Sequence, residues 1–204
     1  ARADLVVPTR GLAEAIAGEW RNSGETVEPG AMPLTGLANA AIDRVAPDPD
    51  SFARQLARYG ETDLLCYRVE APALLVERQE REWAPLLAWA RRRFDVDFTV
   101  TTGIIHAPQP KATVDRLGHA VAALDPFRLA GLSPLVTIGG SLVGALAVAE
   151  HAVTADDGWD AVSLDERWQL EQWGADSEAE AALANRRRDF MSAADFLRLL
   201  DQDP

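Results

Sequence analysis

The sequence predicts an α+β fold in which a helical bundle is the larger part. Apolar side chains recur at helical spacing along most of the 204 residues, and proline or glycine separates the segments. Only residues 96–104 alternate apolar and polar side chains as an interior strand does. One strand needs a partner, and the apolar run at residues 5–7 is the only other candidate. We therefore expect a small sheet and more helices than are needed to cover it.

Two parts are expected along the chain. Residues 1–46 would form an N-terminal β-containing part that is incomplete, because residues 5–7 look like the last strand of a longer run. Residues 47–204 would form a mainly helical bundle domain with one strand near residues 96–105. The proline-containing break at residues 47–50 separates the two parts.

The first helix is expected to follow Thr9, which can cap it. Leu12, Ile16 and Trp20 lie four residues apart, so they share one face of this helix. Residues 34–45 have the pattern of a second amphipathic helix. We expect the apolar side chains of both helices to enter the core.

A third helix is expected from Ser51, and a long fourth helix from about Pro72 to Phe94. Gln79 lies on the apolar stripe of the long helix, among leucines and Trp83. A buried amide needs hydrogen-bond partners, so we expect Gln79 to have one.

The remainder of the chain is helical in pattern. Asp125 and Ser133 each precede a proline, which is the arrangement of a helix cap followed by proline at the first helical position. Thr154 with Asp157 has the spacing of a capping box. Apolar side chains at seven-residue intervals in residues 183–197 predict a last long helix.

Composition excludes several classes of function. The chain carries 32 acidic and 20 basic residues, a net charge of −12, which disfavours nucleic acid and anionic membrane surfaces as partners. Residues 135–149 are apolar but too short to span a membrane, for which about 20 residues are needed. We expect them to form a buried central helix, and we expect no insertion into a membrane.

Few residues could carry chemistry. Cys66 is the only cysteine and lies among apolar residues, as a small buried thiol does, and His119 follows Asp115 by four residues on a helix. We expect no catalytic residue, no metal and no cofactor. Two alternatives stay open, namely a small cytoplasmic enzyme that uses Cys66 or His119, and a helical bundle that binds a ligand beside residues 139–144.

An acidic segment with two tryptophans is the most distinctive feature of the sequence. Residues 151–180 hold nine acidic residues and one arginine, a local net charge of −8. Trp168 and Trp173 are five residues apart, so a regular helix cannot turn both toward the same side. Either one faces the core and the other the surface near Glu171 and Glu178, or both pack within the fold. An aromatic side chain rimmed by charge is typical of a protein interface.

Five segments together resemble a family of assembly chaperones for the catalytic sector of F-type ATP synthase, found in mitochondria and related alphaproteobacteria. They occur in consistent order over nearly the whole chain. The segments are MPLTGLANAAID at 32–43, YGETDLLCYR at 59–68, RQEREWAPLLAW at 78–89, GSLVGALAVAE at 140–150 and DERWQLEQWG at 165–174.

The resemblance implies a chaperone without enzymatic activity. It would bind the unassembled F1 alpha subunit on the surface that later meets the beta subunit, and so prevent aggregation. It implies a small N-terminal β-containing part joined to an orthogonal helical bundle. Free, it would be a monomer in the bacterial cytoplasm, or in the mitochondrial matrix for eukaryotic relatives. The implied contact residues are Glu178, then Glu171, with Trp168, Trp173 and Asp176 beside them.

Overall fold

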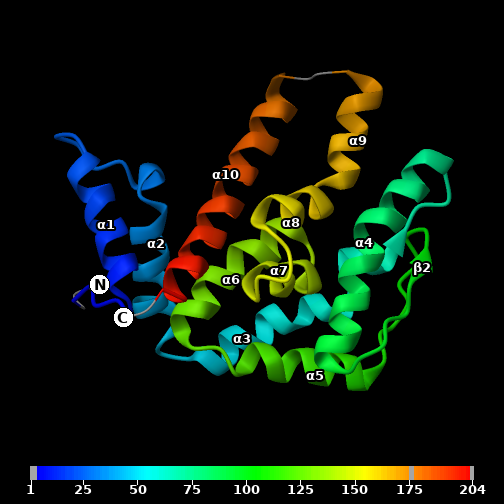
Figure 1. Ribbon diagram of the computed structural model, residues 1–204, viewed down its shortest axis with the longest axis horizontal. Helices are drawn as coiled ribbons and strands as arrows, with labels where there is room; N and C mark the ends of the chain where they lie inside the picture. The colour runs from blue at the N-terminus through cyan, green and yellow to red at the C-terminus, as the bar shows by residue number, and fades with distance from the viewer. Residues whose placement is uncertain (1–3, 175–176, 203–204) are drawn as a thin grey trace.

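The computed structural model describes residues 4–174 and 177–202, and it confirms an α+β fold that is mostly helical (Figure 1). The chain begins with α1 (Arg10–Asn22), a short 3₁₀ turn, and α2 (Pro33–Ala40), which continues into a π-helical turn at Ala41–Val45. Thr9 caps α1 as expected, since its hydroxyl accepts from the Leu12 amide.

The middle of the chain contains α3 (Pro49–Ala57), two short 3₁₀ turns, the strand β1 (Tyr67–Arg68) and the long α4 (Ala73–Phe94). A strand β2 (Thr101–Thr102) pairs with β1 in parallel and makes a two-stranded sheet. Helices α5 (Lys111–Ala122) and α6 (Pro126–Gly139) follow. The chain ends with α7 (Leu142–Ala149), α8 (Ala155–Val162), α9 (Leu164–Trp173) and α10 (Ser177–Leu200).

Helices α6 and α7 form the centre of the bundle. Nearly every residue of α7 is buried, as is expected of a helix that is apolar all round. The C-terminal half of α10 packs along α6, and α4 packs against α7 and α9. The upper halves of α9 and α10 project from this body as a hairpin-like arm (Figure 1).

The strand at residues 96–104 was predicted too long, and its partner was predicted wrongly. Only Thr101–Thr102 pairs, and the partner is β1 rather than residues 5–7, which form no strand. Val96 and Phe98 are buried, but Val100 is 42% exposed and Ile104 is 99% exposed. In the part of the chain that the structure describes, the alternating side chains therefore face the core only in the first half of this segment.

The expected single helix over residues 135–149 is two helices. Gly140 adopts the left-handed conformation (φ +65°) and ends α6. Ser141 then caps α7 by accepting from the Gly144 amide, while buried Asp63 accepts from the Ser141 hydroxyl and the Val143 amide. Ser133 does not start a helix, because Pro134 lies inside α6.

The other predicted caps and stripes are mostly confirmed. Asp125 caps α6, and Thr154 and Asp157 hydrogen-bond each other at the start of α8. Trp20 differs from the expectation, because 49% of it is exposed on α1. Residues 4–46 are helical or irregular and contain no strand, and a division of the chain near residue 46 stays a prediction.

Within the described residues, no helix combines the length and the apolar character needed to cross a membrane.

Candidate functional site

The projecting arm brings the part of the acidic segment that holds Trp168 and Trp173 to one end of the molecule. We define the arm as residues 164–174 of α9 and its C-cap together with residues 177–188 of α10. Gly174 has a positive φ of +87°, which ends α9 and lets the chain turn toward α10. In Figure 1 the C-terminal end of α9 and the N-terminal end of α10 lie together at one end of the molecule.

Trp168 anchors the arm to the body. It is 8% exposed, and the guanidinium of Arg78 on α4 lies 4.8 Å from its ring centroid. Arg78 also donates to the Glu171 carboxylate at 2.7 Å. The Arg78 guanidinium therefore links one turn of α9 to α4 through a cation–π contact with Trp168 and a charge-assisted hydrogen bond to Glu171.

Trp173 faces outward, so the structure answers which of the two tryptophans is exposed. It is 81% exposed, the largest aromatic surface on the described part of the chain. Burial of a large apolar side chain stabilises a folded protein by about 1.5–3 kcal/mol. Trp173 does not contribute most of this free energy in the free protein, because its side chain is exposed. Such a side chain suits a contact with another molecule.

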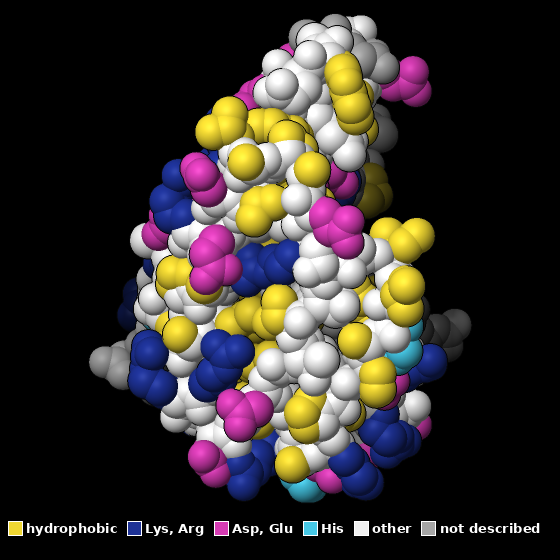
Figure 2. Space-filling view, turned by 90° about the vertical axis from the view of Figure 1, so that its right-hand side faces the viewer, with side chains coloured by type: hydrophobic (Ala, Val, Ile, Leu, Met, Phe, Trp, Pro, Cys, Tyr) yellow, Lys and Arg dark blue, Asp and Glu magenta, His cyan; other side chains and the backbone are white. Residues whose placement is uncertain are grey.

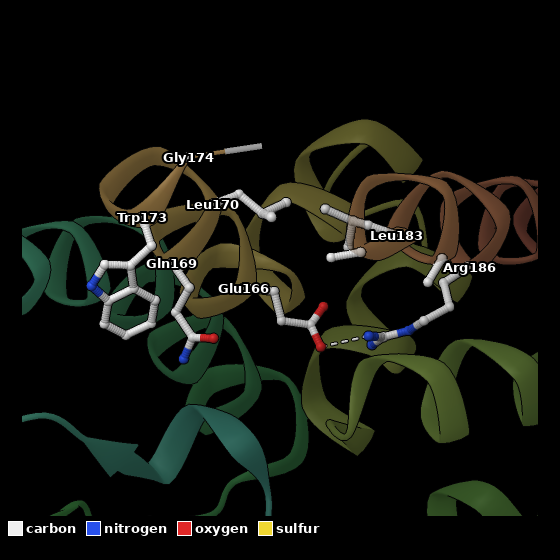
Figure 3. A pocket seen from close by; sticks show the side chains of 9 residues that line it. Glu166, Gln169, Leu170, Trp173, Gly174, Leu183 and Arg186 are labelled. Carbon is white, nitrogen blue, oxygen red and sulfur yellow. Dashed lines mark hydrogen bonds and ion pairs between the residues drawn. The ribbon is translucent and has the colours of Figure 1, made fainter. Parts of the chain in front are cut away.

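A groove of about 450 Å³ lies between the two helices of the arm. Leu170 of α9 and Leu183 of α10 point toward one another across it (Figure 3). Glu166 and Arg186 form an ion pair at its inner end. The remaining lining residues are small, polar or aromatic, namely Gln169, Trp173, Gly174, Ala179 and Ala182.

A polar cluster fixes the base of the arm. Gln79 is 0% exposed, and as predicted it has partners: its amide nitrogen donates to Asp165 at 2.8 Å, and its amide oxygen accepts from the Val69 backbone at 2.9 Å. Arg68 donates to the Gln79 carbonyl and lies over the Trp83 ring. Burial lowers the pKa of Arg68 and raises the pKa of Asp165 above its ordinary value.

Replacing Asp165 by asparagine tests this cluster through its pH dependence. Burial raises the pKa of the Asp165 carboxyl in the folded protein. The contribution of Asp165 to the free energy of unfolding is therefore fully present at acid pH and is lost as the pH rises through this folded-state pKa. Asp165→Asn keeps an oxygen acceptor for Gln79 and removes the buried charge. We expect the variant to melt at or above the wild-type temperature at neutral pH, and the difference to vanish toward acid pH. A variant that melts lower at neutral pH would contradict this.

The structure brings most of the predicted contact residues together on the arm. Glu171 lies one turn from Trp168 and pairs with Arg78, and Glu178 lies exposed in the first turn of α10. Asp176 falls outside the described residues. The sequence prediction missed the groove residues Leu170 and Leu183. Their apolar character in a charged segment was the available signal, but the fold alone shows that they face each other.

The structure shows the surroundings of the residues that the alternative functions would use. Cys66 is 0% exposed, and burial with the nearby Asp63 raises the pKa of its thiol to about 12, so it is protonated and inaccessible at neutral pH. Asp115, which was to orient His119, is held by Lys111. A Cβ added at Gly139 or Gly144 would lie 3.2 Å from Val162, so these glycines allow close helix packing beside α8.

Comparison with known proteins identifies relatives over the whole chain. A family model described as ATP12 chaperone protein matches residues 1–91. The crystal structure of Atp12 from Paracoccus denitrificans is 42% identical, with a TM-score of 0.93 over 98% of this chain and 85% of that one. An aspartate-to-lysine mutant of that protein matches equally well. A candidate chaperone from Agrobacterium tumefaciens is 36% identical, with a TM-score of 0.92 over 98% of this chain and 75% of that one.

Proposed function

This chain belongs to the ATP12 chaperone family, and on this premise we propose that it binds the unassembled alpha subunit of the F1 sector of ATP synthase. The contact would cover the alpha-subunit surface that otherwise meets the beta subunit. The observation that carries the proposal is the 81% exposed Trp173 beside an apolar groove on a projecting arm. The proposal places this binding in the bacterial cytoplasm.

The arm has the chemistry that a holding chaperone needs. An unassembled subunit exposes apolar interface, which favours aggregation until it is covered. Trp173, Leu170 and Leu183 offer apolar surface for such an interface. The acidic side chains around them would meet basic groups of the client, speed the encounter and keep the complex releasable, since contacts at the rim weaken with salt.

Charge reversal at Glu178 tests the proposal. We expect Glu178→Lys to reduce capture of the alpha subunit by about tenfold, because one rim charge changes from attractive to repulsive. The melting temperature should stay within about 2 °C of wild type, since Glu178 is exposed. Capture of purified alpha and beta subunits by immobilised protein, read by quantitative blotting, measures the effect.

Glu25→Lys is the matched control. Glu25 is exposed in the loop between α1 and α2. Figure 1 shows these two helices on the opposite side of the molecule from α9. The same change in net charge there should leave capture unchanged. Normal capture by a stably folded Glu178→Lys protein would remove Glu178 from the interface. Failure of the wild-type protein to prefer alpha over beta would overturn the proposed partner.

A further inference from the structure

A polar groove of about 590 Å³ lies outside the arm. Its walls come from the π-helical turn at Ala41–Val45, from α3 with the 3₁₀ turn at Arg58–Glu61, and from the second half of α6. The π-helical turn and α3 both pack on α6. Figure 1 shows α3 toward the opposite end of the molecule from the joined ends of α9 and α10. The groove is therefore separate from the proposed client contact.

Two arginines of this groove have no acidic partner. Arg44 and Arg58 line it, and neither side chain makes an ion pair or a hydrogen bond with another residue in the described part of the chain. Elsewhere, arginines such as Arg78 and Arg93 are paired with carboxylates. On the face that Figure 2 shows, Lys and Arg side chains lie interspersed with Asp and Glu side chains. In a chain with 32 acidic residues, two unpaired guanidinium groups at one groove suit an anionic ligand.

Both arginines lie in irregular turns of the chain. Arg44 belongs to the π-helical turn that extends α2, and Arg58 begins the 3₁₀ turn that follows α3. π-Helical turns are rare and are frequently found at functional sites. At two separate segments, the backbone thus departs from α-helical geometry where an arginine lines the groove. The groove therefore differs from a surface on which charges are merely scattered.

The groove has further polar groups without internal partners, and it has aromatic surface. The side-chain polar groups of Gln55, Tyr59 and Ser133 make no hydrogen bond to another described residue, so they are available to a ligand. Phe52 and Tyr59 are half-buried and add ring surface. Glu61 is the acidic residue of the lining, which keeps a net positive charge because it has two arginines. The volume lies in the range of about 300–1,000 Å³ that small-molecule sites have.

We propose that this groove binds a phosphorylated small molecule whose organic part is about the size of one ring. A phosphate monoester carries a charge of about −1.5 to −2 at neutral pH and three acceptor oxygens, so it can accept from two guanidinium groups at once. A single carboxylate is matched by one guanidinium fork. The two unpaired arginines therefore favour phosphate over carboxylate. Phe52 and Tyr59 give the organic part an apolar wall.

Phenyl phosphate is the probe, and isothermal titration calorimetry with the full chain measures its affinity. We expect a dissociation constant of about 0.1–1 mM for a ligand of this size. Inorganic phosphate should bind about tenfold more weakly, because it lacks the apolar contact. Benzoate should also bind about tenfold more weakly, because its carboxylate pairs with one guanidinium group.

Substitution of the arginines tests the site. Arg44→Gln and Arg58→Gln should each weaken binding of phenyl phosphate by about tenfold, through the loss of a charge-assisted hydrogen bond. Both variants should melt as wild type does, since the two side chains are exposed and unpaired. Arg54→Gln is the matched control, because Arg54 lies on α3 one turn before Arg58, is exposed and does not line the groove. The same change in charge there should leave the affinity within about twofold of wild type.

A loss of affinity confined to Arg44→Gln and Arg58→Gln supports the proposal. Absence of saturable binding of phenyl phosphate at about 10 mM would overturn it. An equal loss in Arg54→Gln would also overturn it, since the binding would then follow the general charge of the surface. Benzoate or inorganic phosphate binding as tightly as phenyl phosphate would show that the ligand is not a phosphate ester. The alpha subunit takes no part in these measurements, so their outcome leaves the proposed function to its own test.

Discussion

Replacing Trp173 by alanine is expected to weaken capture of the alpha subunit by about 30- to 1,000-fold, the 2–4 kcal/mol that an aromatic hot spot contributes at an interface. The indole is 81% exposed in the free protein, so its removal deletes contact surface without opening a cavity. The melting temperature should therefore stay close to that of wild type. Titration calorimetry with purified alpha subunit, beside a thermal melt, measures both quantities.

Trp20→Ala provides the comparison for this variant. Trp20 is also partly exposed, at 49%, but it lies on α1 and not on the arm. If exposed aromatic side chains contributed to capture without specificity, both variants would bind the alpha subunit more weakly. If Trp173 makes a specific contact, only Trp173→Ala loses affinity. If the wild-type protein and Trp173→Ala bind the alpha subunit with equal affinity, Trp173 does not contribute to this contact.

The second large effect is on stability, for Trp83→Ala. Trp83 is 0% exposed in α4, and its indole nitrogen donates to the Ala161 carbonyl of α8 at 2.7 Å. Its ring also lies under the guanidinium of Arg68, 5.0 Å from the ring centroid. Truncation leaves a cavity and an unpaired carbonyl, which should cost about 3–5 kcal/mol. For a chain of this size the melting temperature should fall by about 6–20 °C.

Trp83→Phe separates the two causes of that loss. Phenylalanine fills much of the space but cannot donate to Ala161, so its cost should be nearer 1–3 kcal/mol. Chemical denaturation of both variants gives the free energies of unfolding. A Trp83→Ala protein that unfolds at the wild-type denaturant concentration would show that the core relaxes around the missing ring.

The helices were largely predictable from the sequence, because their signals are local. Thr9 and Asp125 are capping residues whose side chains accept from amides two or three residues later, and they cap the helices as predicted. The long helix α4 was recognised from its apolar stripe. Even buried Gln79 could be expected to find partners, although its contact with Asp165, 86 residues away, could not be read from the pattern.

The strand and the arm depended on information that the sequence pattern does not contain. Alternation at residues 96–104 predicts a covered strand, but whether a second layer covers Ile104 depends on distant segments. The spacing of Trp168 and Trp173 put them on different sides of a regular helix, without saying which one turns inward or whether both pack within the fold. Trp168 is the one that packs inward, and the guanidinium of Arg78 on α4 lies over its ring.

The hydrogen bond from the Thr9 hydroxyl to the Leu199 carbonyl, at 2.8 Å, joins residues 190 positions apart and has a consequence for synthesis. Helices α1 and α2 both pack on α10, the last helix described. Neither can complete its packing until α10 has been made. The 160 residues from the end of α2 at Ala40 to the end of α10 at Leu200 take about 8–32 s to translate at about 5–20 residues per second. During that interval the apolar surfaces of α1 and α2 that pack on α10 have no cover, which is the same hazard that this chaperone is proposed to relieve in its client.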